Sequence, residues 1–298
     1  MGTVGEYLKD WLTIRSATVK PRTLEQYEDA VRKICDVVGA RDLSALTPAA
    51  CAAVYAPAMA AGHERTAQIL FVVLRMALRD AVGMGLLTAS PMAALHRPRH
   101  DAAEIEPYTS DDVRAMFAAD PDRLYCWRLL YETGLRRGEA CGLRWCDVDF
   151  RVRTVSVRQQ VVSVKGVLQV GAPKTAAGLR TLTISETLCD MLRAHLMDQV
   201  AAGRRGEYVL SPDGAMLRPS RINNWLRRCA DRADVVGAHP HRWRHTFGAD
   251  AVSAGTDIRV LQKLLGHSDI SVTAKYYAFV RGDVLRAAAA RIADFRAV

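Results

Sequence analysis

The chain has 298 residues, a formal net charge of +9, and a hydrophobic content of 50%. The length is sufficient for two domains with their own cores, and the hydrophobic content excludes a wholly disordered chain. The positive charge favours a polyanionic partner, of which nucleic acid is the first candidate.

The cysteine pattern and the N-terminus indicate the compartment. Seven cysteines occur without any C-x-x-C pair, which favours reduced thiols in a cytoplasmic protein. The first residues lack the basic segment and apolar core of a signal peptide. No apolar run approaches the roughly 20 residues that a membrane span needs. We therefore expect a cytoplasmic protein with no membrane partner.

The N-terminal part, residues 3 to 96, predicts four helices separated by turn signals. The first begins after Thr3, and the second is capped by Thr23 and runs through Ile34. The third follows Thr47, and the fourth covers residues 65–82, where apolar side chains recur at helical spacing. Residues 1–97 thus form a helical domain, and the charged, proline-flanked residues 98–107 form a linker.

Residues 108–298 predict a second domain that is mostly α-helical. Its first helix is capped by Thr109 or Ser110. β-Branched residues that partly alternate with polar ones form a small antiparallel sheet set among the helices. The segments predicted as strands are 154–157, 161–164, 167–170 and 181–184. The fold class is therefore mainly α with one small antiparallel β-sheet.

Five separate motifs of this second domain carry cationic or nucleophilic side chains. Cleavage of a phosphodiester builds negative charge on the nonbridging oxygens, and a protein without a metal must counter it with fixed cations, best with arginines. A phenol can supply the attacking oxygen. The motifs, in chain order, are Thr133-Gly134-Leu135-Arg136, Pro173-Lys174-Thr175, His241-Arg242-Trp243-Arg244, Gly266-His267 and Tyr276-Tyr277.

This order of motifs resembles the catalytic domain of the tyrosine recombinases, the phage-integrase family of site-specific DNA recombinases. Residues 18–27 and 85–92 are similar to parts of the SAM-like core-binding domain of that family. The resemblance implies a core-binding domain over residues 1–97 and a catalytic domain over residues 108–298. It also implies that the two domains close as a C-shaped clamp around DNA.

The resemblance further implies a role for each cationic residue. Arg136 and Arg244 would hold the scissile phosphate, and His241 would accept a proton or a hydrogen bond. His267 would donate a hydrogen bond to a nonbridging oxygen. Lys174 lies in a turn between two predicted strands, where a lysine at the tip of a hairpin would protonate the departing 5′ oxygen as a general acid. Lys165 is the second candidate.

The nucleophile has two candidates, because the family places its tyrosine nine or ten residues after the second histidine. The residues that follow Tyr277 favour it over Tyr276, which would then line the core. The chain departs from the family's usual ending by carrying Phe279 where histidine is common. Attack would leave a 3′-phosphotyrosyl enzyme and a free 5′ hydroxyl, with neither ATP nor a metal required.

One alternative use of the histidines remains open. His239, His241 and His245 could ligate a metal through a His-x-His pair and an i, i+4 pair. No acidic or cysteine ligand clusters near them in the sequence, and His245 would instead pack inside, as the resemblance implies. We expect no cofactor and no metal.

The expected function is site-specific recombination that integrates or excises a phage or mobile element. Four protomers would exchange strands between two double-stranded DNA sites through a Holliday junction. A directionality factor or a host DNA-bending protein could assist. The apolar stripe of residues 283–298 would dock on a neighbouring protomer or on its own domain. Two other functions stay open: a non-catalytic DNA-binding regulator, and a type IB topoisomerase-like or telomere-resolving enzyme.

Overall fold

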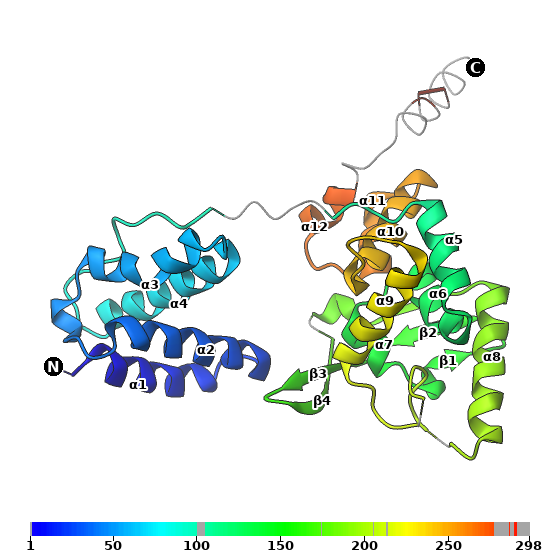
Figure 1. The fold of residues 1–298 in the computed structure, drawn as a ribbon, viewed down its shortest axis with the longest axis horizontal. Helices are drawn as coiled ribbons and strands as arrows, with labels where there is room; N and C mark the ends of the chain where they lie inside the picture. Colours follow the sequence, from blue (N-terminus) through cyan, green and yellow to red (C-terminus); the bar gives the residue numbers. More distant parts are fainter. Residues whose placement is uncertain are drawn as a thin grey trace. The chain divides into compact units, whose positions relative to one another are not determined.

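The computed structural model describes residues 2–99, 105–173, 175–204, 206–212, 214–276, 286, 289 and 290. The chain divides into two compact units, Met1–Ala103 and Glu104–Val298, and the division lies inside the segment predicted as a linker. The fold is mostly helical with small antiparallel sheets, which confirms the predicted fold class (Figure 1). None of the helices that the structure describes is both long and apolar enough to cross a lipid bilayer.

The first unit is built from four helices whose starts follow local capping signals. Thr3 begins α1 with a capping box, and Thr47 caps α3 by accepting a hydrogen bond from the Ala50 amide. The predicted cap at Thr23 is wrong. The second helix already begins at Pro21, because the fixed φ of proline suits the first helical position. The helices are α1 (Val4–Ser16), α2 (Pro21–Val38), α3 (Pro48–Ala60) and α4 (Glu64–Gly83).

Aromatic side chains join α1 to α4 in the core of the first unit. Trp11 is buried, and its indole Nε1 donates a hydrogen bond to Asp80 Oδ2 at 2.8 Å. The Tyr7 hydroxyl donates to the Ala77 carbonyl. Buried polar groups are thereby satisfied where they would otherwise destabilise the core.

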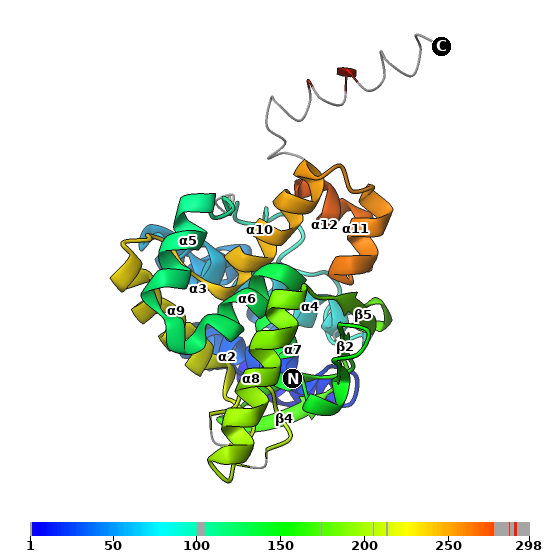
Figure 2. The ribbon, with the colours of Figure 1, turned by 90° about the vertical axis from the view of Figure 1, so that its right-hand side faces the viewer.

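The second unit surrounds its core with eight helices of the described chain (Figure 2). Trp127 and Trp243 are fully buried at the centre of this core. Thr109 caps α5 through a capping box with Asp112, as predicted. The helices are α5 (Ser110–Ala119), α6 (Leu124–Thr133), α7 (Arg137–Gly142), α8 (Glu186–Ala201), α9 (Pro219–Ala233), α10 (Pro240–Ser253), α11 (Ile258–Leu265) and α12 (Ile270–Ala274).

The strands form two small sheets rather than the single predicted one. One sheet has the order β1-β2-β5, and the other is the hairpin β3-β4; both are antiparallel. Lys165 and Gly166 join β3 to β4 with φ values of 47° and 80°, which suit a two-residue hairpin turn. The strands are β1 (Val148–Asp149), β2 (Thr154–Val157), β3 (Gln160–Val164), β4 (Val167–Gly171) and β5 (Arg180–Thr183).

This strand pairing corrects the expected hairpin between β4 and β5. The two strands belong to different sheets and do not pair with each other. The segment between them is therefore a crossover from one sheet to the other, and not the tip of a hairpin. A short 3₁₀ turn, Ala176–Gly178, lies within this crossover just before β5.

Candidate active site

Arg136 is positioned by a sharp turn between α6 and α7. Gly134 ends α6 with φ of 57°, and a Cβ there would approach the Phe247 ring to 2.8 Å, so glycine is required. Arg136 then precedes the first residue of α7. Its guanidinium donates from Nη1 to Glu139 Oε1 at 2.7 Å and from Nη2 to the Gly266 carbonyl at 3.2 Å.

Arg244 projects from α10 into the interior and is fully buried. Its Nη1 donates to the Gly134 carbonyl at 2.8 Å, and its Nη2 donates to the Leu265 carbonyl. Among the described residues its Nε has no hydrogen-bond partner. Burial and the charge of Arg136 lower the pKa of Arg244 to about 10. A buried cation with an unused donor suits an anionic oxygen atom.

His267 follows a glycine that ends α11. Gly266 has φ of 65°, which turns the chain and leaves His267 only 7% exposed. The ring Nδ1 forms a 2.9 Å hydrogen bond with the Thr273 hydroxyl. Burial, together with the positive charges of Arg244 and Arg136, lowers the pKa of His267 to about 3. The imidazole is thus neutral at physiological pH.

Tyr276 lies against the same groups. Its ring is parallel to that of His267 with centroids 6.1 Å apart, and the His245 ring is 5.1 Å away. The side chain is buried, as expected for the tyrosine that lines the core, but it also lies within the electrostatic influence of Arg244 and Arg136. Burial raises the pKa of Tyr276, and the charges of Arg244 and Arg136 act against this rise.

His241 and His245 lie on consecutive turns of α10, with ring centroids 5.0 Å apart. Burial is the main cause that lowers the pKa of His245 to about 4, and the charges of His239 and Arg244 add to it, whereas His241 is exposed. His245 is half-buried, and its Nδ1 has no partner in the described part of the chain. His239, His241 and His245 are not among any group of side chains able to hold a metal ion in the described ranges. The described residues therefore give no support to the metal-site alternative.

Other predicted residues lie elsewhere. Lys174, Tyr277 and most of the 283–298 stripe fall outside the described residues. Lys165 occupies the tip of the β3-β4 hairpin, whose opposite end, at Gln160, packs on Gly138 and Gly142 of α7. At the rise of a β-strand, the tip is about 16 Å from that end. Lys165 is therefore a poor candidate for a group that must meet Arg136.

Arg180 is a buried cation of this cluster that the sequence did not single out as a site residue. Its side chain is 6% exposed and pairs with Glu139 at 2.9 Å, so one carboxylate bridges Arg136 and Arg180. Burial opposes ionisation of Glu139, but its bonds to the two arginines outweigh burial and lower its pKa. Arg180 begins a strand of β-branched residues, and nothing in the neighbouring sequence indicates its contact with Glu139.

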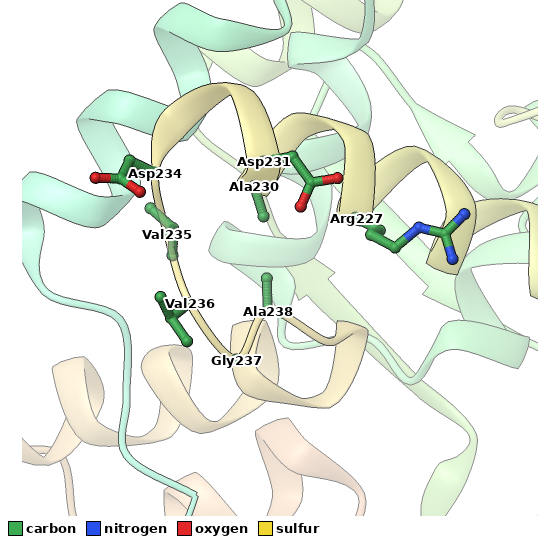
Figure 3. Close-up of a pocket in the computed structure, with 8 residues that line it drawn as sticks. All are labelled: Arg227, Ala230, Asp231, Asp234, Val235, Val236, Gly237 and Ala238. Carbon is green, nitrogen blue, oxygen red and sulfur yellow. The ribbon is translucent and has the colours of Figure 1, made fainter.

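A separate surface pocket of about 480 Å³ lies at the C-terminal end of α9 (Figure 3). None of the predicted catalytic residues lines it, so we assign it no part in the chemistry. Its walls combine exposed charged side chains with small apolar ones. The lining residues are Arg227, Ala230, Asp231, Asp234, Val235, Val236, Gly237 and Ala238.

The chain matches two family models. The Phage integrase family model matches residues 108–281, which is more than half of the chain, and the model of the phage integrase N-terminal SAM-like domain matches residues 3–56. Among curated proteins, tyrosine recombinase XerC of Mesorhizobium japonicum is 28% identical, over 90% of this chain and 89% of its own. The integrase of Mycobacterium phage L5 is 27% identical, over 92% of this chain and 74% of its own.

Solved structures share the fold. The Tn1549 transposon integrase in complex with a circular intermediate DNA has a TM-score of 0.83 and 21% identity, covering 98% of this chain and all of that one. A lambda integrase tetramer bound to a Holliday junction has a TM-score of 0.70 and 20% identity, covering 90% of this chain and 78% of that one. The family match and the relatives together show that this chain belongs to the phage integrase family of tyrosine recombinases, which are site-specific DNA recombinases.

Proposed function

We propose that the chain cleaves and rejoins DNA with Tyr276 as its nucleophile, within a cradle formed by Arg136, Arg244, His241 and His267. The observation that carries the proposal is the place of the buried Tyr276 side chain, whose ring packs parallel to that of His267 and whose pKa burial raises against the opposing charges of Arg244 and Arg136. A phenol oxygen beside a buried arginine lies where an attacking atom and a phosphate-binding group must meet. Tyr277, which the sequence favours as the nucleophile, lies outside the described residues, and its assignment stays a prediction.

The reaction follows from these side chains. The Tyr276 oxygen forms a bond to phosphorus as the bond from phosphorus to the 5′ oxygen breaks. The phenolic proton passes to His241 or to water, and a proton from Lys174 neutralises the departing 5′ oxygen. Arg136 and Arg244 bind the nonbridging oxygens, on which negative charge grows. The ester energy is retained in the phosphotyrosyl bond, so the step reverses without ATP.

His267 would act as a hydrogen-bond donor and not as a cation. Its pKa of about 3 makes it neutral at physiological pH. If the Thr273 hydroxyl donates to Nδ1, the ring proton lies on Nε2, which then faces the phosphate as a donor. The parallel packing of the Tyr276 ring on His267 holds both groups at the same side of the cradle.

We propose that each unit has the role that its matching family model suggests. The first unit would bind core DNA, and the second would add catalysis. The described structural relatives include a tetramer on a Holliday junction, which supports a homotetramer acting on two double-stranded DNA sites. Integration or excision of a mobile element and help from a directionality or DNA-bending factor belong to this proposal. The C-shaped clamp and the docking of the 283–298 stripe stay predictions.

Covalent capture tests the proposal. The full chain is incubated with nicked duplexes that carry randomised flanks around a fixed nick, and adducts that survive SDS are isolated and their DNA sequenced. Peptide mapping of the adduct then identifies the attached residue. We expect a 3′-phosphotyrosyl link at Tyr276 and its loss in Tyr276→Phe.

The other outcomes are equally informative. Attachment at Tyr277 would overturn the assignment of Tyr276 while keeping the enzyme class. Absence of any adduct from the wild-type chain, with DNA binding intact, would favour a non-catalytic regulator. Relaxation of supercoiled DNA without strand exchange between two selected sites would favour a topoisomerase-like use of the same chemistry.

A further inference from the structure

Three arginines converge on the C-terminal end of α11. The Leu264 carbonyl accepts a hydrogen bond from Arg180 Nε at 2.7 Å. The next carbonyl, Leu265, accepts from Arg244 Nη2, and the Gly266 carbonyl accepts from Arg136 Nη2. The last carbonyls of a helix lack partners within the helix and carry partial negative charge, so they attract cations. Consecutive carbonyls thus place three guanidinium groups side by side.

Arg180 differs from the other two arginines in how its donors are used. Its Nε donates to Leu264, its Nη1 donates to the Gly178 carbonyl at 3.1 Å, and its Nη2 donates to Glu139 Oε2 at 2.9 Å. Each of its three nitrogens therefore has a protein partner, whereas Arg244 Nε has none in the part of the chain that the structure describes. With its side chain 6% exposed, Arg180 is placed to hold the protein and not to bind a phosphate.

The partners of Arg180 belong to segments that each carry a candidate catalytic group. Glu139 also accepts two hydrogen bonds from Arg136. Its Oε1 accepts from Nη1 at 2.7 Å, and its Oε2 accepts from the backbone amide at 3.0 Å. Leu264 lies three residues before His267. Gly178 ends the 3₁₀ turn that follows position 174, and Gly266 packs so closely on this turn that a Cβ would approach the Ala177 carbonyl to 2.8 Å.

We infer that Arg180 is a positioning residue of this active site, which sets Arg136 through Glu139 and fixes the α11 end against the crossover segment before β5. The inference rests on the proposed function, since it concerns the rate of the same cleavage step. Loss of a side chain with this role displaces the catalytic groups, so it lowers the cleavage rate more than it lowers the affinity for DNA. A displacement of about 1 Å at a catalytic group lowers a rate roughly 10²-fold.

The test uses the full chain and the nicked duplex selected by covalent capture. Single-turnover cleavage is measured at saturating protein, and DNA affinity and melting temperature are measured separately. We expect Arg180→Met to lower the saturating rate by about 10²-fold while DNA affinity changes by less than about threefold. Arg180→Lys keeps the positive charge but loses the planar guanidinium that makes the three hydrogen bonds. Its rate should therefore lie between those of wild type and Arg180→Met.

Arg144→Met is the matched control. Arg144 pairs with Asp147 at 2.9 Å in the same unit, and Asp147 is buried like Glu139, but among the described residues neither forms an ion pair with Arg136, Arg180 or Arg244. This variant should lose thermal stability and keep its saturating rate. A rate for Arg180→Met no lower than that of Arg144→Met would overturn the inference. If Arg180→Met fails to fold, a wild-type rate for Arg180→Lys overturns it instead.

A double variant adds an independent readout. Because part of the effect of Arg180 reaches Arg136 through Glu139, Arg180→Met combined with Glu139→Gln should lose less rate than the product of the two single losses. Losses that multiply would contradict this relay. If the proposed function is wrong, the wild-type chain itself forms no adduct. That outcome is distinct from a failure of the Arg180 inference, in which the wild-type chain still cleaves.

Discussion

The contact between Tyr276 and the backbone of α10 makes Gly248→Ala a sharp test of how the nucleophile is held. A Cβ at Gly248 would lie 2.5 Å from Cδ1, 2.6 Å from Cε1 and 2.9 Å from Cγ of the Tyr276 ring. Carbon atoms in favourable contact are about 3.5 to 4.0 Å apart, so the ring must retreat by about 1 Å. The retreat carries the phenol oxygen away from Arg244.

We expect Gly248→Ala to lower the cleavage rate strongly and the stability of the fold only moderately. Overpacking of this kind costs about 1–3 kcal/mol of stability, which a folded domain tolerates. A misplacement of about 1 Å at the attacking atom should lower the single-turnover cleavage rate roughly 10²-fold. The assay measures adduct formation at saturating protein with the selected nicked duplex, alongside DNA affinity and melting temperature.

Gly171→Ala is the control for this substitution. Gly171 lies in the same unit, and no atom of the described residues lies within 4 Å of an added Cβ, so this variant should cleave at the wild-type rate. If Gly248→Ala folds, binds DNA and cleaves within about threefold of wild type, the packing of Tyr276 on α10 does not set the position of the attacking oxygen.

Two further predictions concern protonation and metal. The folded pKa of His267 is about 3 against about 6.5 in the unfolded chain, so its contribution to stability is present above pH 6.5 and is lost as pH falls toward 3. Urea unfolding should show a loss of up to about 2 kcal/mol from His267 between about pH 6.5 and about pH 5. This part of the pH dependence should vanish in His267→Gln, and an unchanged slope in that variant would contradict the low pKa. Chelation by EDTA should leave adduct formation unchanged, because Arg136 and Arg244 supply the positive charge that a metal ion would otherwise supply; loss of activity that Mg²⁺ restores would refute this.

The sequence by itself determined most of the helices and the two mainly helical units. Capping by Thr3, Thr47 and Thr109 involves residues three positions apart, so local order alone predicts it. The motifs around Arg136, His241, Arg244 and His267 were likewise readable, because each depends on neighbours within one helical turn or one glycine turn.

Only the tertiary structure decided which distant groups meet. Arg180 contacts Leu264 across 84 residues, and Arg136 contacts Gly266 across 130. Their acceptors are backbone carbonyls, which every residue carries, so no sequence pattern marks them. The pairing of β2 with β5 and the electrostatic interaction of Tyr276 with Arg244 are of the same kind. They depend on how helices and strands pack after they form, and packing is a property of the whole core.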